Sequence, residues 1–204
     1  MEYITSSDFH FKDTAVALGK FEGIHRGHQL LMDEVKKQEL HGLRSVVFTF
    51  DRPTRLTLTG DTEYKQIYTK KERREILEKR GIDILIEHPF TKEFAALTPD
   101  RFIREVLVEK VGAKVIVVGT DFHFGKNRSG SITDLEKLEE ECGYHLIVVE
   151  KLQLNGKDIS STRIRASLEK GAMEEAKALL GRNYSVSGEI LHGNALGRTI
   201  QVPT

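Results

Sequence analysis

The chain has 204 residues, with 31 Lys and Arg against 31 Asp and Glu, so its formal net charge is +0. That balance argues against a protein that coats nucleic acid or anionic membrane, and a chain of this length can build a core without disulfides or metal. The single Cys142, the charged residues in 1–13 and the lack of an apolar run near the ~18 residues of a membrane span predict a soluble, cytoplasmic protein without a signal peptide. The oligomeric state is left open.

Short β-branched runs alternate with longer charged segments along the chain. Five of these runs are predicted to be buried strands: Thr14–Leu18, Ser45–Phe50, Ile82–Ile86, Lys114–Val118 and His145–Val149. Strands that alternate with helices imply right-handed crossovers, a parallel sheet and helices on both faces. The sequence therefore predicts an α/β, Rossmann-like fold.

The segments between the predicted strands carry helix signals. The segment Gly27–Glu39 has apolar residues four apart, and the other starts are marked by capping-box spacing or by a proline in the first turn. These starts are Thr69 with Glu72, Thr98 with Pro99, and Thr133 with Glu136.

The pattern changes after Gly181. Apolar or small residues now alternate with polar ones, as in an antiparallel strand: Tyr184, Val186, Gly188 and Ile190. About twenty residues cannot bury a core of their own, so we expect residues 183–204 to be an edge appendage or the opening of a further domain.

The most informative segment is Gly19–His28, because ligands of an open parallel sheet bind beyond the carboxyl ends of its strands. Its glycines let the backbone approach a phosphate, and the next helix directs N–H groups at the anion. His25 and His28, three apart, can donate hydrogen bonds to charge that develops on an α-phosphate, and a bound phosphate would favour their protonated forms. Such a pair also occurs in zinc half-sites and on plain surfaces, but no further Cys or His stands at zinc-ligand spacing.

Polar residues follow the later strands as well. Asp121 is a candidate acceptor for a ribose or base, or a simple turn residue. The segment Ser160–Arg165 is a candidate site for a leaving pyrophosphate, or a plain Ser/Thr helix cap with solvated arginines. The stretch Gly119–Lys126 looks like a Walker loop, but five residues separate its glycines and Asn127 replaces the Ser or Thr, so no γ-phosphate transfer is expected.

With these motifs the sequence resembles the bacterial bifunctional riboflavin kinase/FMN adenylyltransferase family, also called FAD synthetase. Residues 19–28 are similar to its Gly-Asn-Phe-Asp-Gly-Val-His-Arg-Gly-His motif, residues 118–125 to its Val-Gly-x-Asp-Phe-x-Phe-Gly segment, and residues 159–165 to its Ile-Ser-Ser-Thr-x-Ile-Arg. The resemblance implies that residues 1–182 form a nucleotidyltransferase domain that joins FMN to AMP from ATP, with magnesium, to give FAD and pyrophosphate. Residues 183–204 are similar to the opening of the family's riboflavin kinase β-barrel, so no riboflavin kinase activity is expected from this chain.

Motifs and resemblance together imply three groups of site residues. The expected catalytic residues are His25, His28 and Arg163. The expected ATP-binding residues are Gly19, Lys20, Phe21, Gly27, Gly119, Asp121, Ser161 and Thr162. The expected flavin-binding residues are Asp51, Arg52, Pro53, Phe122 and Arg128. We expect Mg²⁺ to be held by the ATP phosphates rather than by side chains.

The sequence departs from the family pattern in its first motif, in the loop after the predicted strand Ser45–Phe50, and at Gln201, which replaces a Gly of the kinase segment. Lys20 stands where the family has Asn, Glu22 where it has Asp, and Arg52 lies in a loop where it has Asp-Pro-His-Pro. These departures leave two alternatives: a nucleotidyltransferase with another acceptor, such as nicotinate mononucleotide or phosphopantetheine, or a flavin- and nucleotide-binding module that has lost catalysis.

Overall fold

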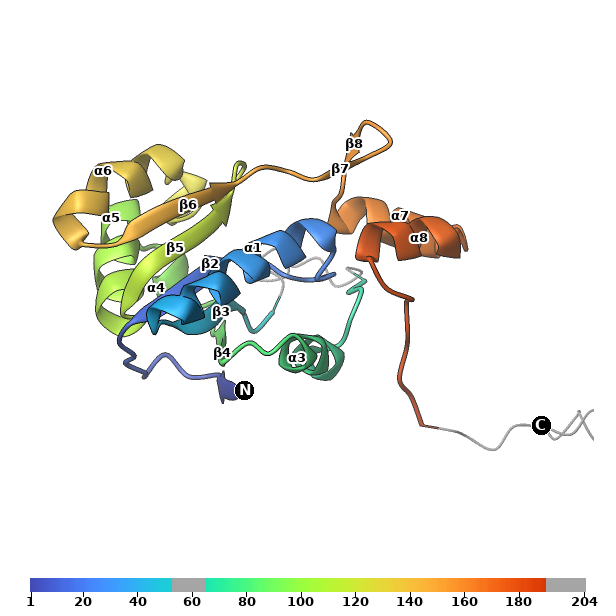
Figure 1. Cartoon of the computed structure of the whole chain (residues 1–204), viewed down its shortest axis with the longest axis horizontal. Coiled ribbons are helices and arrows are strands. Elements are labelled where there is room, and N and C mark those ends of the chain that lie inside the picture. The colour runs from blue at the N-terminus through green and yellow to red at the C-terminus, as the bar shows by residue number, and fades with distance from the viewer. Residues whose placement is uncertain (53–64, 190–204) are drawn as a thin grey trace, which may run out of the picture.

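The structure is a computed structural model that describes residues 1–52 and 65–189. Figure 1 shows a central sheet with helices on both faces. The sheet has six strands, all parallel, in the order β1-β4-β3-β2-β5-β6. Its strands are β1 Glu2–Ile4, β2 Thr14–Leu18, β3 Arg44–Phe50, β4 Ile84–His88, β5 Ala113–Gly119 and β6 His145–Val149. The five predicted strands are β2 to β6, which confirms the parallel α/β prediction, and β1 is an addition.

The helices fill the connections between strands. They are α1 Arg26–Lys37, α3 Lys70–Lys79, α4 Lys92–Ala95, α5 Pro99–Arg101, α6 Ile132–Cys142, α7 Ser161–Glu169 and α8 Met173–Leu180. A π-helix, η2, spans Phe102–Lys110, and short 3₁₀ helices span Gln38–His41 and Lys126–Arg128. A small antiparallel hairpin, β7 Gln153–Leu154 with β8 Lys157–Asp158, separates β6 from α7. The hairpin thus stands between the last strand of the sheet and Ser160, an insertion that the sequence analysis did not predict.

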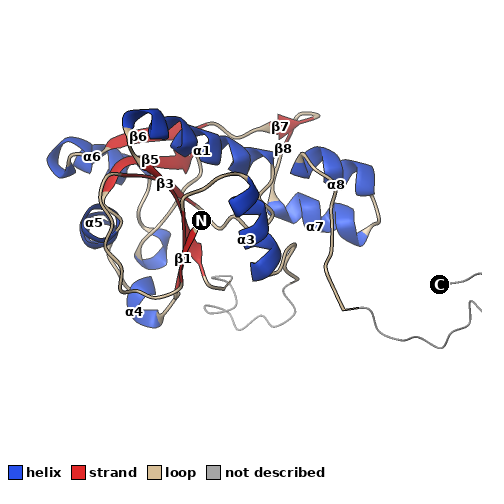
Figure 2. Ribbon diagram, turned by 60° about the horizontal axis from the view of Figure 1, so that its bottom comes forward, coloured by secondary structure: helices blue, strands red, loops and turns tan. Residues whose placement is uncertain are grey.

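Alternate residues of each strand supply two separate cores. Val16 and Leu18 of β2 face a cluster with the π-helix and α6, whereas Ala15 and Ala17 face a cluster with α1 and α3. This two-sided burial explains why the strands read as continuous apolar runs. Figure 2 shows the same layers from another side.

The strand order reverses between β2 and β5. From β2 the chain builds outward through β3 and β4, and then returns to β5 on the other side of β2. A crevice forms at such a reversal, outside the carboxyl ends of the two strands. Helices α7 and α8 lie beyond this end of the sheet in Figures 1 and 2, over a third apolar cluster that includes Ile67, Ile164 and Leu180.

Two of the three predicted helix caps are confirmed, and the third is wrong. Thr69 and Glu72 form the expected capping box of α3, and Thr98 caps α5 with Pro99 in its first turn. The capping box predicted at Thr133 is wrong, since Ser131 and Asp134 cap α6 two residues earlier. Both pairs have the same spacing, so spacing alone does not choose between them.

The last described residues form no strand. Residues 183–189 have no regular secondary structure, so the predicted alternation at Tyr184 to Gly188 does not give a strand there. Residues 190–204, which carry the rest of the predicted barrel segment, lie outside the described residues. Among residues 1–52 and 65–189, no helix is long and apolar enough to cross a membrane.

Candidate active site

The loop after β2 forms a tight turn that ends in helix α1. Phe21 and Ile24, both fully buried, adopt left-handed backbone conformations with φ of 44° and 42°. Such values are uncommon for residues with a side chain, and they are rarest for a β-branched residue such as Ile24. His25 follows as the N-cap of α1, and its Nδ1 accepts a hydrogen bond from the His28 backbone N–H at 3.3 Å. The strained turn thus fixes the first histidine.

The two imidazole rings lie face to face. Their centroids are 3.6 Å apart with an interplanar angle of 16°, and the Phe21 ring meets His28 edge-on at 5.1 Å. Because the His25 Nδ1 is an acceptor, the neutral ring carries its proton on Nε2. The His28 Nδ1 is buried and has no hydrogen-bond partner among the described residues.

The surroundings of the two rings oppose protonation. Burial, and then the positive charge of Arg182, lower the pKa of His25 to about 4. Burial and the neighbouring His25 hold the pKa of His28 well below its usual range. The turn therefore presents neutral imidazoles, whose N–H groups are hydrogen-bond donors without a full charge.

Helix α7 lies next to this turn, as the motif positions predicted. A Cβ on Gly23 would be 3.6 Å from the Ser161 Oγ, and the Arg165 guanidinium contacts the Glu22 carboxylate at 3.1 and 3.2 Å. Ser160 is the N-cap of α7, accepting a hydrogen bond from the Arg163 N–H at 3.2 Å. Thr162 is exposed. The first and last motifs are thus brought together.

Arg163 points away from the histidine turn. Its guanidinium pairs with Glu175 of α8 at 2.8 Å and donates to the carbonyl oxygens of Leu154 and Lys157 in the hairpin, at 3.0 and 3.2 Å. These contacts tie α7 to the hairpin and to α8. In this structure the arginine of the motif that reaches the turn is Arg165, two residues later and on another side of the helix.

Basic side chains gather beside the turn. The Lys20 carbonyl accepts a hydrogen bond from the Thr49 Oγ1 at 3.0 Å, which joins the turn to β3. Burial, and then the charge of Arg128, lower the pKa of Lys20, with Arg165 acting in the same direction and Glu22 against it. Arg128, Arg165 and Glu22 are therefore close enough to Lys20 to act on its charge. Three cations and one carboxylate thus lie near the turn.

The loop after β5 lies on the other side of the strand reversal. Gly119 ends β5, and the Asp121 carboxylate pairs with Lys151 at 3.0 Å. Lys151 also reaches Asp158 of the hairpin at 3.4 Å. Asp121 thus joins the loop to the hairpin and remains largely exposed. No helix follows as it would in a Walker loop, since a 3₁₀ turn at Lys126–Arg128 comes next and α6 starts only at Ile132.

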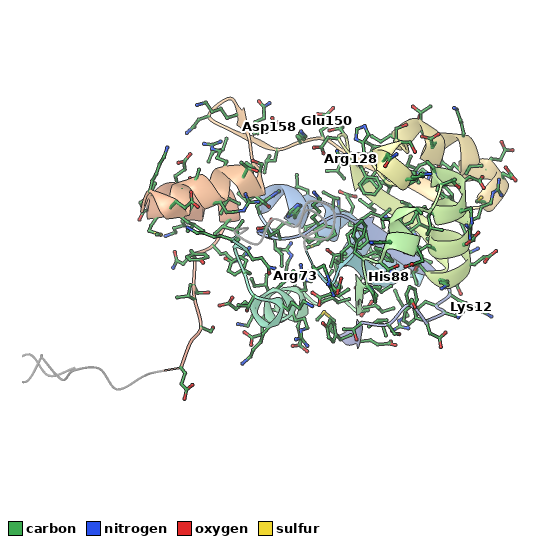
Figure 3. The ribbon with its side chains drawn as sticks, turned by 180° about the vertical axis from the view of Figure 1, so that it is seen from behind. Lys12, Arg73, His88, Arg128, Glu150 and Asp158 are labelled. Atoms are coloured by element: carbon green, nitrogen blue, oxygen red, sulfur yellow. The ribbon has the colours of Figure 1, made fainter. Side chains whose placement is uncertain are left out.

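Arg128 lies in a loop with left-handed backbone conformations. Asn127 and Arg128 have φ of 56° and 59°, and Phe124 and Gly130 pair across this loop as an isolated bridge. Figure 3 labels Arg128. Phe122 packs on Phe124 with ring centroids 5.5 Å apart. The loop therefore presents the exposed Arg128 and the partly exposed Phe122 ring.

The segment after β3 forms a turn with the end of β4. Asp51 accepts a hydrogen bond from the Phe90 N–H at 3.1 Å and also pairs with Arg52, whose side chain is mostly exposed. Pro53 lies outside the described residues. Asp51 therefore has a structural role in the turn whether or not it contacts a flavin.

Sequence reasoning missed an aromatic group at these strand ends. The Phe50 ring meets Phe90 at 4.8 Å and Phe94 at 5.7 Å, and all three are only partly buried. Arg73 supports this end of the sheet, because it donates to the Phe50 carbonyl and pairs with the fully buried Glu87 of β4. Figure 3 labels Arg73 together with His88, the last residue of β4. Phe50 ends β3, Phe90 lies in the loop after β4, and Phe94 lies in α4. Because the rings come from different segments of the chain, no single sequence motif could have predicted that they meet.

Among the described residues, no three His, Cys, Asp or Glu side chains gather as a metal-binding set.

Most of the chain is similar in sequence to known proteins. A model of the FAD synthetase family matches residues 8–163. A bifunctional riboflavin kinase/FMN adenylyltransferase of Listeria monocytogenes is 34% identical over 203 residues, which are 98% of this chain and 64% of that protein. Proteins of the same description from Buchnera aphidicola and Escherichia coli are 32% and 34% identical and are covered to 62% and 61%. The chain thus spans less than two thirds of these relatives.

Solved structures share the fold. A Streptococcus pneumoniae structure described as a macrolide-efflux protein superposes with a TM-score of 0.87 and 31% identity over 100% of this chain and 67% of that one. A pantoate-β-alanine ligase of Francisella tularensis gives a TM-score of 0.52 at 14% identity, covering 97% of this chain and 85% of that one. The second likeness concerns the fold alone.

Proposed function

The chain belongs to the FAD synthetase family, and from this premise we propose that it is an FMN adenylyltransferase. In this reaction a phosphate oxygen of FMN forms a bond to the α-phosphorus of ATP. The bond from that phosphorus to the α,β-bridging oxygen breaks, so that AMP is joined to FMN as FAD and pyrophosphate leaves. No covalent intermediate with the protein is needed.

The observation that carries this proposal is the meeting of two motifs at the strand reversal. The neutral His25 and His28 lie at the N-terminus of α1, and the Arg165 of α7 reaches the same turn. A reaction of this kind needs the substrates positioned and the developing charge stabilised, and the protein contributes little covalent chemistry. Imidazole N–H donors near the α-phosphate would stabilise the negative charge that develops there in the transition state.

The leaving pyrophosphate needs cations on the far side of the α-phosphate. We assign this role to Lys20 and Arg165, with Ser161 and Thr162 at the N-terminus of α7 as further donors. Arg163, which the sequence suggested for it, is held by Glu175 and the hairpin carbonyls. Magnesium would enter with ATP, bound to its phosphates, as part of the substrate.

The flavin side of the site lies at the ends of β3, β4 and β5. Phe50, Phe90, Phe94 and Phe122 offer apolar surface for a flat ring system, and Arg128 offers a cation for a phosphate. Gly119 and Asp121 would contact the nucleotide across the reversal.

The proposal is tested by incubating the chain with ATP, Mg²⁺ and one acceptor at a time, followed by chromatography. We expect FAD from FMN, and no adenylylated product from nicotinate mononucleotide or phosphopantetheine. A product from either of those acceptors in place of FAD would show a different transferase. Tight binding of FMN and ATP without any product would show a binding module that has lost catalysis.

A further inference from the structure

We infer that Arg182, just after α8, is a positioning residue that holds the histidine turn in its working shape. The inference rests on the proposed function, since the turn is taken to be the catalytic one. Arg182 lies beyond residues 8–163, the part that the family model matches. It is separated from the turn by 158 residues of sequence, and no motif pointed to it.

The Arg182 guanidinium donates hydrogen bonds to backbone carbonyl oxygens of the histidine turn. Its Nη1 donates to the Ile24 carbonyl at 2.7 Å, and its Nη2 donates to the Gly23 carbonyl at 2.9 Å. The planar guanidinium presents these two donors in a fixed geometry, which a lysine ammonium does not reproduce. Two successive carbonyls are therefore set in one orientation by one side chain.

The turn needs such a restraint at this point. Ile24 is fully buried in a left-handed conformation, which costs about 1–3 kcal/mol for a residue of this kind and persists only when the surroundings impose it. Gln29 of α1 adds a second restraint, because its side-chain amide donates to the Ile24 carbonyl at 3.0 Å and to the Leu180 carbonyl at 2.8 Å. The next residue in the chain is His25, so the direction of its ring follows from the backbone at Ile24.

Arg182 has no carboxylate partner among the described residues, and this sets it apart from the other half-buried arginines of the site. Arg165 pairs with Glu22 and Arg163 with Glu175, whereas Arg182 lies over the Tyr68 ring at 5.1 Å. Its charge is therefore not cancelled by an ion pair, and it acts on both imidazoles to lower their pKa values. Glu22 acts in the opposite sense on His25.

The residues after Arg182 extend the same connection. The Tyr184 hydroxyl donates to the Ile67 carbonyl at 3.1 Å, and the Ser187 N–H donates to the Glu72 carboxylate at 2.9 Å. Glu72 is also part of the capping box of α3. The segment Arg182–Ser187 thus runs from the histidine turn to the start of α3.

The test compares Arg182→Ala, Arg182→Lys and Gln29→Ala, with Arg101→Ala as the control for loss of an exposed arginine. We expect kcat for FAD formation to fall about tenfold to a hundredfold in Arg182→Ala and Arg182→Lys, and less in Gln29→Ala, with the KM for ATP within about threefold. Arg101→Ala should match the parent chain. An unchanged kcat in a folded Arg182→Ala or Arg182→Lys protein would overturn the inference.

A second readout does not depend on activity. Histidine ring NMR, with His25 assigned by a His25→Asn variant, should show the His25 pKa rising by about half a unit or more in Arg182→Ala and much less in Arg182→Lys, which keeps the charge. If the parent chain makes no FAD, the proposed function fails, and the ring chemical shifts still decide whether Arg182 orients the turn. If Arg182→Ala does not fold, Arg182→Lys and Gln29→Ala decide. Ring shifts and His25 pKa unchanged in every folded variant would overturn the inference.

Discussion

At the scale of single residues, the histidine turn presents two neutral rings. The sequence predicted that they follow a strand and lie at the start of a helix, and the structure confirms this placement. It could not predict their charge. A bound phosphate was expected to favour protonation, whereas burial and Arg182 favour the neutral rings, and both causes come from parts of the chain far from the motif.

Removing one ring tests its role as a donor. His28→Ala should lower kcat/KM for FAD formation by about a hundredfold to a thousandfold, since loss of one preorganised donor typically costs about 2.7–4 kcal/mol of transition-state stabilisation. His41→Ala, which removes an exposed histidine, is the control and should have no effect. An activity of His28→Ala within twofold of the control would contradict the assignment. The measurement is steady-state FAD formation by fluorescence.

The lowered pKa of His25 also predicts how stability depends on pH. Between pH 6.5 and 4 the unfolded chain binds a proton at His25 that the folded chain does not, so the free energy of unfolding falls as the pH falls. The expected contribution is about 1.4 kcal/mol per pH unit in this window. Urea unfolding at several pH values measures it. His25→Asn keeps an acceptor for the His28 N–H and should have a smaller slope; an equal slope would show that His25 is not the cause.

At the scale of elements, the two arginines of helix α7 contact different parts of the molecule. Arg163 anchors the hairpin and α8, and Arg165 faces the turn after β2. The sequence motif contains both arginines, but it does not indicate which side of the helix faces the histidine turn. That depends on how α7 packs on the third apolar cluster, which only the folded chain shows.

A pair of variants tests this division. Arg165→Ala should raise the KM for ATP about tenfold or more, because a charged group facing the phosphates is lost. Arg163→Ala should instead lower the free energy of unfolding by about 1–2 kcal/mol, because its carbonyl contacts and a partly exposed ion pair are lost. Steady-state kinetics and urea unfolding on both variants measure the two effects. The opposite pattern would return the phosphate role to Arg163.

The misplaced or missed elements have physical causes of their own. β1 has only three residues, too few to show a period. Helix α8 begins at Met173, and its N-cap residue Ala172 has no side chain that can cap it, so the helix lacks the signal that marked α3. The long strands were predicted well because burial on both faces leaves continuous apolar runs, which do not depend on any single residue.

At the scale of the whole molecule, the order of strands decides where the site is. Five predicted strands were enough to infer a parallel sheet, and a parallel sheet places every strand-end loop at one edge. The structure adds the reversal between β2 and β5 and the helices α7 and α8 beyond it. The tail of the predicted barrel segment falls on residues 190–204, outside the described part, so that domain boundary remains a prediction.

We propose that the chain transfers the AMP part of ATP to FMN at the histidine turn. The direct measurement uses ATP labelled with ³²P at the α- or the γ-phosphate, together with FMN and Mg²⁺, and follows the label by chromatography. We expect α-label in FAD and γ-label in pyrophosphate, with both signals greatly reduced in His28→Ala. Label from the γ-position in a flavin product, or no label transfer at all from the α-position, would contradict it.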